Sequence, residues 1–189
     1  MMKLLFLALF LFGLSLPLQA KKLAGVTVAD RITSANQETL LLNGMGLREK
    51  MWIDVYVGSL YLIKPSYDVA DILSWPNAFR IQLDFIYSEV TPEKLLKAWK
   101  EGFEKNQTEV TLKAMQTEIA RFYGLFKESA VKGDRYTIDY APDSGVSVRK
   151  NDVLLGVIQG EEFKSALLEI WLGNYPADKQ LKKGMLGLE

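Results

Sequence analysis

The sequence predicts an α+β fold in which a large, mostly antiparallel sheet has helices packed on one of its faces. The middle of the chain alternates between stretches with a two-residue apolar period and stretches with a helical period, which indicates a mixed fold. The elements follow one another as strands, two central helices, a meander of three strands and then helices. One long strand is apolar on both faces, as expected for a strand inside a sheet.

The first predicted strands lie in the N-terminal third of the chain. Residues 25–29 form a short strand, residues 34–36 a turn and residues 38–43 a second, apolar strand. The GMG sequence at 44–46 is expected to interrupt that strand. The long run 52–63 follows, and apolar side chains occupy both of its parities. We therefore expect this run to be buried on two sides and central in the sheet.

Two central helices are predicted after a short helix at 68–74 and a strand at 79–85. The first begins at Thr91-Pro92, because a hydroxyl before a proline is typical of a helix N-terminus. The second opens at Thr108. Each has an apolar stripe that is expected to face the core rather than a cofactor. The stripes are Leu95, Leu96, Trp99 and Phe103 in the first helix, and Met115, Ile119, Phe122, Tyr123 and Phe126 in the second.

The C-terminal third of the chain predicts three strands followed by two helices. Residues 136–140 alternate Tyr and Ile with Thr and Asp, which is the pattern of a half-buried strand. Residues 146–158 form a hairpin around a polar turn. A helix at 161–172 ends at a glycine, a common helix stop, and a short helix at about 178–186 closes the chain.

The N-terminal segment has the parts of a cleavable signal peptide. Lys3 gives a basic start, an apolar run of about ten residues follows, and Ala20 is a small residue before a polar start. The run is bounded by Pro17, and it is too short to span a bilayer, which takes about 20 apolar residues. We predict a signal peptide at 1–20 and a single domain at 21–189. An uncleaved anchor is the alternative.

Removal of the predicted signal peptide leaves 169 of the 189 residues, with 22 basic and 23 acidic side chains. This length suits one domain with its own core. The balanced charge gives no reason to expect nucleic acid as a partner, since that requires a basic face. No second apolar stretch is long enough to span a membrane. We therefore expect a soluble monomer in the periplasm, with secretion as the alternative.

The chain contains neither Cys nor His, and this excludes several kinds of chemistry. Disulfides and lipid attachment at a cysteine are not available. The usual ligands of zinc, copper and haem are missing. A catalytic triad would lack its usual histidine base, and there is no thiol to act as a nucleophile. The common nucleotide-binding and nucleophile motifs are also missing. We expect no metal and no cofactor, which leaves carboxylates, Lys, Arg, Tyr and hydroxyl groups for any chemistry.

One group of residues near the start of the long strand suggests a site for an anion. Arg48, Trp52, Asp54 and Tyr56 share parity, so in the absence of a bulge their side chains point to the same side of the sheet. A guanidinium binds a carboxylate through two hydrogen bonds, and a phenol adds another donor. Arg48 and Tyr56 are therefore a candidate carboxylate-binding pair. The alternative is a solvated Arg in a turn and a Tyr of the core.

The motifs that carry a family resemblance lie in three stretches: 41–62, LLNGMGLREKMWIDVYVGSLYL; 91–106, TPEKLLKAWKEGFEKN; and 166–187, ALLEIWLGNYPADKQLKKGMLG. The G-x-G-x-R lead into a long strand, the tryptophan-bearing helix and the I-W-L-G helix end are fairly specific in combination. Together they resemble the bacterial exported, chalcone isomerase-like branch of the chalcone isomerase superfamily. The resemblance covers nearly all of the mature chain. It implies an open-faced β-sandwich, with a ligand cleft between a large antiparallel sheet and a layer of helices.

The superfamily contains plant isomerases that close a chalcone to a flavanone, and non-catalytic relatives that bind fatty acids. The resemblance places Arg48 on the arginine shared by both groups. It places Tyr56 where the fatty-acid binders have Tyr and the isomerases have Thr. The isomerases have Tyr and Asn where this chain has Lys94 and Glu101, and Ser or Thr where it has Ile170. Only the arginine of the catalytic set is kept, which favours binding over catalysis.

The resemblance therefore predicts a non-catalytic binder of a fatty acid or a similar small amphipathic anion, held by Arg48 and Tyr56. Candidates for the apolar wall of the cleft are Trp99, Phe103, Met115 and Phe122. Two alternatives stay open. One is an isomerase, or intramolecular lyase, of an unknown substrate. The other is a structural or partner-binding envelope module whose cleft is filled by side chains.

Overall fold

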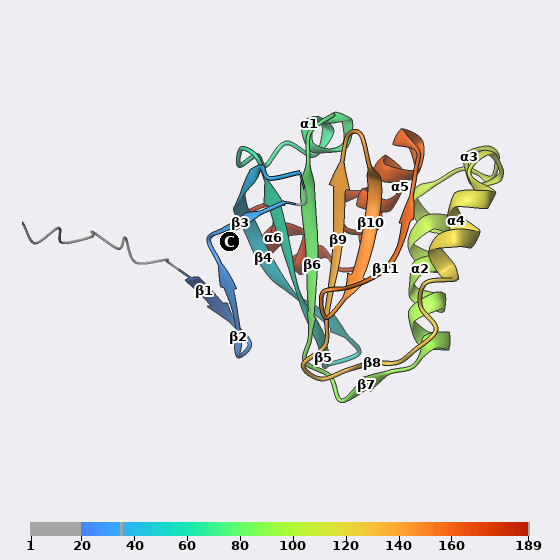
Figure 1. The fold of residues 1–189 in the computed structure, drawn as a ribbon. Coiled ribbons are helices and arrows are strands. Elements are labelled where there is room, and N and C mark those ends of the chain that lie inside the picture. Colours follow the sequence, from blue (N-terminus) through green and yellow to red (C-terminus); the bar gives the residue numbers. More distant parts are fainter. Residues whose placement is uncertain (1–19, 35, 189) are drawn as a thin grey trace, which may run out of the picture.

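The computed structural model describes residues 20–34 and 36–188, and its centre is a seven-stranded sheet. The strands lie in the order β11-β10-β9-β6-β5-β4-β3, and every neighbouring pair is antiparallel (Figure 1). Apart from Ala20, the predicted signal peptide at 1–20 lies outside the described residues. The α+β class and the large antiparallel sheet predicted from the sequence are confirmed.

The longer elements lie close to those expected from the apolar periods, whereas the short strands β1, β3, β7 and β8 were not expected. In chain order they are β1 (Ala20–Leu23), β2 (Val26–Ala29), β3 (Arg31–Thr33), β4 (Thr39–Lys50), β5 (Ile53–Leu62), α1 (Val69–Ser74), β6 (Phe79–Phe85), β7 (Glu89–Val90), α2 (Pro92–Asn106), α3 (Glu109–Ala114), α4 (Gln116–Tyr123), β8 (Ala130–Val131), β9 (Arg135–Ala141), β10 (Gly145–Lys150), β11 (Val153–Ile158), α5 (Glu161–Leu172) and α6 (Lys179–Met185). The helix expected from Thr108 is divided into α3 and α4, because Met115 leaves the helical conformation. In the described part of the chain, no helix has the length and hydropathy to cross a membrane.

β4 and β5 form one hairpin, which differs from the interrupted strand expected at residues 44–46. β4 continues through its two glycines to Lys50, and Met51 and Trp52 make the turn into β5. Trp52 is therefore not part of the long strand, and its side chain is 93% exposed. A bulge also lies just after Arg48, so the expected unbroken alternation is wrong. Arg48 and Tyr56 nevertheless lie on the same face of the sheet, because they are direct cross-strand partners.

Helix α6 explains why β4 carries two glycines. A Cβ atom on Gly44 would lie 2.1 Å from the carbonyl oxygen of Gly184, and one on Gly46 would lie 2.8 Å from the backbone of α6. The helix backbone thus packs directly on the strand, which no larger side chain allows. Asp178 caps the N-terminus of α6. The packing of α6 on β4 therefore holds the start of the helix, with Asp178, against the strand that carries Arg48.

The helices cover one face of the sheet and enclose the main core. In Figure 1, α5 and α6 lie behind the sheet, while α2, α3 and α4 lie along its β11 side. A group of aromatic rings, 4.9 to 6.1 Å apart between centroids, joins α2, α4 and α5. Its members are Trp99, Phe103, Phe122, Phe126, Phe163 and Trp171. Offset and edge-to-face packing of this kind gives a stiff layer above the sheet.

The opposite face of the sheet carries a second, smaller apolar cluster around Leu40 and Tyr61, and ion pairs between β6 and β9 cover another part of it. Arg80 pairs with Asp139 at 2.5 Å, and Arg135 pairs with Asp84 at 2.6 Å. Asp139 and Thr137 are buried as a result, so β9 is buried on both faces. The expectation that this strand is half-buried is therefore wrong. Alternating polar residues show which side chains face away from the core. They do not show that side chains from a neighbouring strand cover those residues.

Candidate functional site

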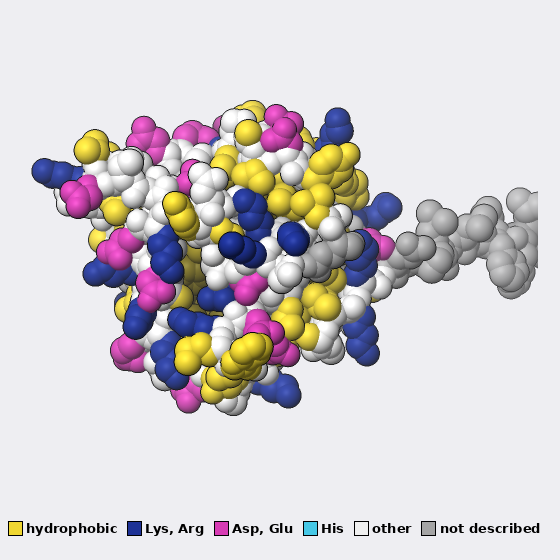
Figure 2. Space-filling view, turned by 180° about the vertical axis from the view of Figure 1, so that it is seen from behind, with side chains coloured by type: hydrophobic (Ala, Val, Ile, Leu, Met, Phe, Trp, Pro, Cys, Tyr) yellow, Lys and Arg dark blue, Asp and Glu magenta, His cyan; other side chains and the backbone are white. Residues whose placement is uncertain are grey.

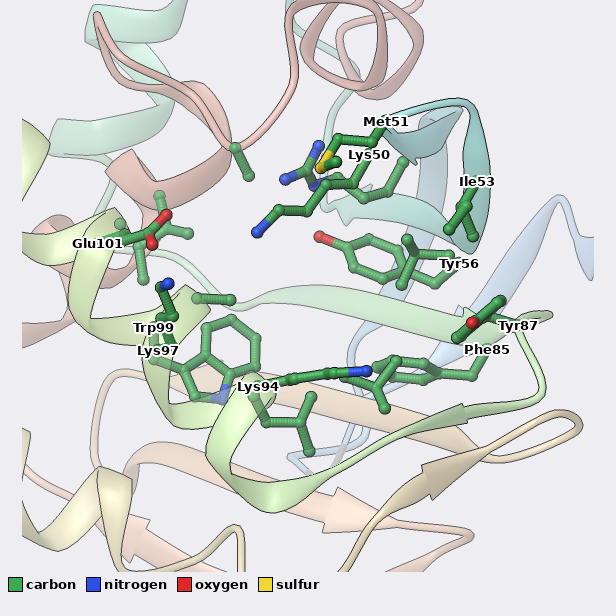
Figure 3. A pocket seen from close by; sticks show the side chains of 18 of the residues that line it. Lys50, Met51, Ile53, Tyr56, Phe85, Tyr87, Lys94, Lys97, Trp99 and Glu101 are labelled. Atoms are coloured by element: carbon green, nitrogen blue, oxygen red, sulfur yellow. The ribbon is translucent and has the colours of Figure 1, made fainter.

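A pocket of about 440 Å³ opens between one end of the sheet and helix α2. Its walls come from the β4–β5 hairpin, the end of β6, α2, α5 and residues 175–177 before α6 (Figure 3). In Figure 2 a hollow with a hydrophobic floor is visible on the helix side, with Lys and Arg side chains along its edge. The volume lies within the range of about 300–1,000 Å³ that is usual for small-molecule sites.

Most of the pocket wall is apolar. The apolar side chains include Ile53, Val55, Phe85, Leu95, Ala98, Trp99 and Ile170. They come from two strands and two helices that the core holds in place. Such a wall can bury a hydrocarbon chain, but it offers no partner to a buried polar group.

Arg48 is held on the β4 side of the pocket by contacts that leave part of its guanidinium free. Its Nη1 donates to the carbonyl oxygen of Glu49 at 2.5 Å and lies 3.5 Å from Oδ2 of Asp178. Arg48 and Asp178 are each 18% exposed. The longer distance is beyond the usual length of a charge-assisted hydrogen bond, so Asp178 orients the guanidinium without satisfying all five of its donors.

Tyr56 presents a hydroxyl proton to the pocket. The side chain is 9% exposed, and its oxygen accepts a hydrogen bond of 3.1 Å from Nε1 of the buried Trp171. Burial raises the pKa of the Tyr56 phenol above 10.0, although the charge of Arg48 acts in the opposite direction. The phenol is therefore protonated at neutral pH. Within residues 36–188 its hydrogen is given to no protein acceptor, and Figure 3 shows the hydroxyl pointing into the pocket.

Positive charge is concentrated on the pocket lining, although the whole chain has a formal net charge of zero. The lining holds five cationic and two acidic side chains. They are Arg48, Lys50, Lys94, Lys97 and Lys105, with Glu89 and Glu101. One acid is partly neutralised, because Glu101 lies 3.9 Å from Lys105 on the same helix. In Figure 3 the Lys50 ammonium points into the pocket towards the Tyr56 hydroxyl.

The structure brings together some of the residues expected at the site and separates others. Trp99, a candidate for the apolar wall, lines the pocket. Phe103, Met115 and Phe122 do not line it; they are buried in the core, where Phe103 and Phe122 pack against Phe163 of α5. Lys50 was missed. Its position two residues after Arg48 was the available signal.

The resemblance places other residues at four positions in the isomerases, and all four line the pocket: Tyr56, Lys94, Glu101 and Ile170. Ile170 has no group that can donate a hydrogen bond. Within the described residues, no three His, Cys, Asp or Glu side chains are grouped as metal ligands would be. The cations and the Tyr56 hydroxyl of the lining can recognise negative charge and hydrogen-bond acceptors beside an apolar surface.

The site is thus an apolar pocket lined by cations and a phenol, set in an open-faced β-sandwich. The chain belongs to the chalcone isomerase-like family, whose pattern matches residues 20–187. Among solved structures it is similar to the crystal structure of a fatty-acid binding protein of Arabidopsis thaliana. The TM-score is 0.71 at 16% identity, over 89% of this chain and 96% of that chain. No curated protein matches the chain. The predicted family and fold are confirmed.

Proposed function

We propose that the protein binds a fatty acid or a similar small amphipathic anion in this pocket and does not transform it. Arg48 and Tyr56 hold the head group, Lys50 adds a second positive charge, and the apolar wall takes the tail. The observation that carries the proposal is the Tyr56 hydroxyl, which points into an apolar pocket beside two cations. The likeness in fold to a fatty-acid binding protein supports it.

The hydrogen-bonding state of Tyr56 favours an anionic head group. Trp171 already donates to the phenol oxygen, so the hydroxyl proton is free to be donated. Arg48 and Lys50 have no acceptor to offer it. A carboxylate satisfies these groups together: one oxygen accepts from the phenol, and the guanidinium and ammonium balance the charge. A neutral alcohol head group would leave Lys50 without a counter-charge and Arg48 with the distant carboxylate of Asp178 alone.

The apolar wall favours a hydrocarbon tail. Each methylene group that enters the pocket is worth about 0.8 kcal/mol before the cost of ordering the chain. Affinity should therefore rise with tail length until the pocket is filled. The alternative in which side chains fill the cleft predicts no open pocket, whereas the described residues enclose about 440 Å³.

The proposal is tested by titrating the purified protein with palmitate and with hexadecanol, which share a tail and differ in the head group. We expect palmitate to bind roughly 10- to 100-fold more tightly, which is the range for hydrogen bonds to a charged group. Equal affinities would contradict a charge-selective site. Native mass spectrometry of the protein from its own cell, followed by organic extraction, then identifies the natural ligand.

An isomerase is the second candidate, because Arg48 and a hydroxyl donor both face the pocket. Ring closure needs a stabilised phenolate and a polarised carbonyl. Arg48 can supply the first, but Ile170 cannot help with the second. This candidate predicts turnover of some phenolic enone that Arg48→Ala abolishes. Lack of turnover across a broad panel of enones, by a protein that binds palmitate, would leave binding as the function.

Tyr56→Phe is expected to weaken palmitate binding about 5- to 10-fold, because it removes one hydrogen bond to the head group and leaves Arg48 in place. It also leaves the buried Trp171 N–H without its acceptor, so the free energy of unfolding should fall by about 1–3 kcal/mol. Titration and chemical denaturation measure the two effects. Tyr67→Phe is the matched control, since that hydroxyl is exposed and away from the pocket. Unchanged palmitate affinity in Tyr56→Phe would remove Tyr56 from the head-group site.

We propose that this binding takes place outside the cytoplasm, in the periplasm or in the external medium. The support is the predicted signal peptide at 1–20, whose basic start and apolar run precede Ala20. N-terminal sequencing of the protein from its own cell should give a chain that begins at Lys21. A chain that retains Lys3 would mean that the segment is not removed and would favour the anchored alternative.

A further inference from the structure

We propose that the β4–β5 turn docks on the surface of an anionic lipid bilayer and so brings the pocket to the membrane. The docking surface consists of Met51, Trp52 and Ile53 at the turn and of Lys50, Lys94 and Lys97 beside it. The docking step stands apart from the proposed function. Only the idea that an amphipathic ligand then moves between bilayer and pocket rests on that function.

The turn exposes large apolar side chains that the fold does not use. Met51 is 82% exposed, Trp52 is 93% exposed and Ile53 is 41% exposed. Met51 and Ile53 also line the pocket, so this apolar tip is continuous with the pocket wall (Figure 3). Trp is the residue most suited to the boundary between lipid and water, where its ring is buried and its N–H stays hydrated.

The backbone of the turn makes the choice of these residues costly. Met51 and Trp52 have φ values of 51° and 65°, a left-handed conformation that favours Asn and Gly. The β10–β11 turn has nearly the same geometry, with φ values of 49° and 67°, and there the chain uses Asn151 and Asp152. The same protein thus has a favourable sequence for this turn and does not use it in β4–β5. Packing does not compensate, because both side chains are exposed, and such conflicts are typical of functional positions.

Lysine side chains surround the apolar tip. Lys50 comes directly before it, and Lys94 and Lys97 stand on the first turns of α2 across the pocket; all three are exposed. The two acidic residues of the hairpin, Glu49 and Asp54, lie opposite each other in the strand register, and neither lines the pocket. A lysine near an anionic membrane contributes about a fivefold gain in affinity, and its long stem lets the charge reach the head groups.

A bilayer fits this surface better than a protein partner does. A stable protein interface buries about 800 Å² on each side, whereas three apolar side chains on one turn offer much less. A membrane needs only a few inserted side chains and nearby positive charge. In Figure 2 the Lys and Arg side chains and a group of hydrophobic side chains lie close together around the hollow. An amphipathic anion could then reach the pocket without crossing bulk water.

Trp52→Gly separates docking from both folding and ligand binding. We expect co-sedimentation with vesicles of phosphatidylglycerol and phosphatidylcholine in equal parts to weaken about tenfold or more, because most of the inserted apolar surface is lost. Glycine suits the turn, so the midpoint of thermal unfolding should rise by about 2–4 °C. Trp52 does not line the pocket, so palmitate affinity in solution should not change. Asp152→Gly, the matched turn position in β10–β11, should leave vesicle binding unchanged.

Each outcome of this experiment decides for or against docking. Wild-type binding that falls in phosphatidylcholine vesicles and at high salt, and that Trp52→Gly reduces, supports it. No binding of the wild type to the mixed vesicles at low salt overturns it, and so does equal binding by Trp52→Gly. Mass photometry that shows a dimer lost in Trp52→Gly would assign the tip to a second copy of the chain and would also overturn docking. Palmitate binding in solution is measured separately, so its failure would count against the proposed function alone.

Discussion

Gly184→Ala is expected to lower the free energy of unfolding by about 3 kcal/mol and to weaken ligand binding as well. A Cβ atom at this position would lie 2.5 Å from the carbonyl oxygen of Met45 and 2.6 Å from the Cα of Gly46. Both atoms belong to the backbone of β4, so no side chain can rotate out of the way. Overpacking of this kind costs about 1–3 kcal/mol or more.

The sign of the effect makes the test decisive. In an ordinary helix interior, Gly to Ala stabilises a protein by about 1 kcal/mol, because alanine restricts the unfolded chain and favours the helix. In α6 the contact with β4 reverses that gain. The helix must move away from the strand, and Asp178 at its N-terminus moves with it. Arg48 then loses the carboxylate that orients it, so palmitate affinity should fall together with stability.

Gly124→Ala is the matched control for this substitution. Gly124 follows α4, it has a right-handed conformation, and its Cβ would have no neighbour closer than 3.4 Å. The change should leave stability within about 0.5 kcal/mol of the wild type or raise it slightly. Urea denaturation of the three proteins gives the comparison. A Gly184→Ala protein as stable as Gly124→Ala would show that α6 does not depend on direct backbone contact with β4.

The glycines of β4 show where sequence reasoning was limited. Gly44 and Gly46 were expected to interrupt a strand, because glycine is usually a sign of a turn. Their real role depends on Gly184, which lies far along the chain, and no periodicity within residues 41–62 shows that contact. The resemblance noted the G-x-G-x-R pattern, but the reason for it becomes visible only when α6 is placed on the strand. The true turn, at Met51 and Trp52, carries none of the residues that usually indicate one.

The site was predicted in part, and the difference has a physical cause. Parity along one unbroken strand was expected to place Arg48 and Tyr56 on one side of the sheet. They do share a face, but the reason is that they are cross-strand partners in a hairpin. The helical stripe of α2 correctly marked Trp99 and Phe103 as buried residues. A stripe shows that a side chain leaves water, but it does not show whether that side chain meets other core residues or an open pocket. Phe103 meets Phe122 and Phe163, whereas Trp99 reaches the pocket.

Arg48→Ala is expected to weaken palmitate binding about 10- to 100-fold, which is the largest effect of any single change at the pocket. In the proposed site the guanidinium supplies hydrogen bonds to a charged head group, and a hydrogen bond to a charged group is worth about 1.5–3 kcal/mol. Its removal also leaves Asp178 without its partner, and a bare carboxylate repels an anionic ligand. Lys50 keeps one positive charge in the pocket, so binding should be weakened rather than abolished.

Two comparisons distinguish this effect from a loss of structure. Hexadecanol has the same tail without the charge, so its affinity should change less than about threefold in Arg48→Ala. The free energy of unfolding should change by less than about 1 kcal/mol, because the ion pair with Asp178 is long, at 3.5 Å, and is not fully buried. Arg48→Lys keeps the charge but not the planar fork of donors, and we expect its palmitate affinity to lie between those of the wild type and Arg48→Ala. Equal losses for palmitate and hexadecanol would mean that Arg48 supports the pocket wall and does not contact the head group.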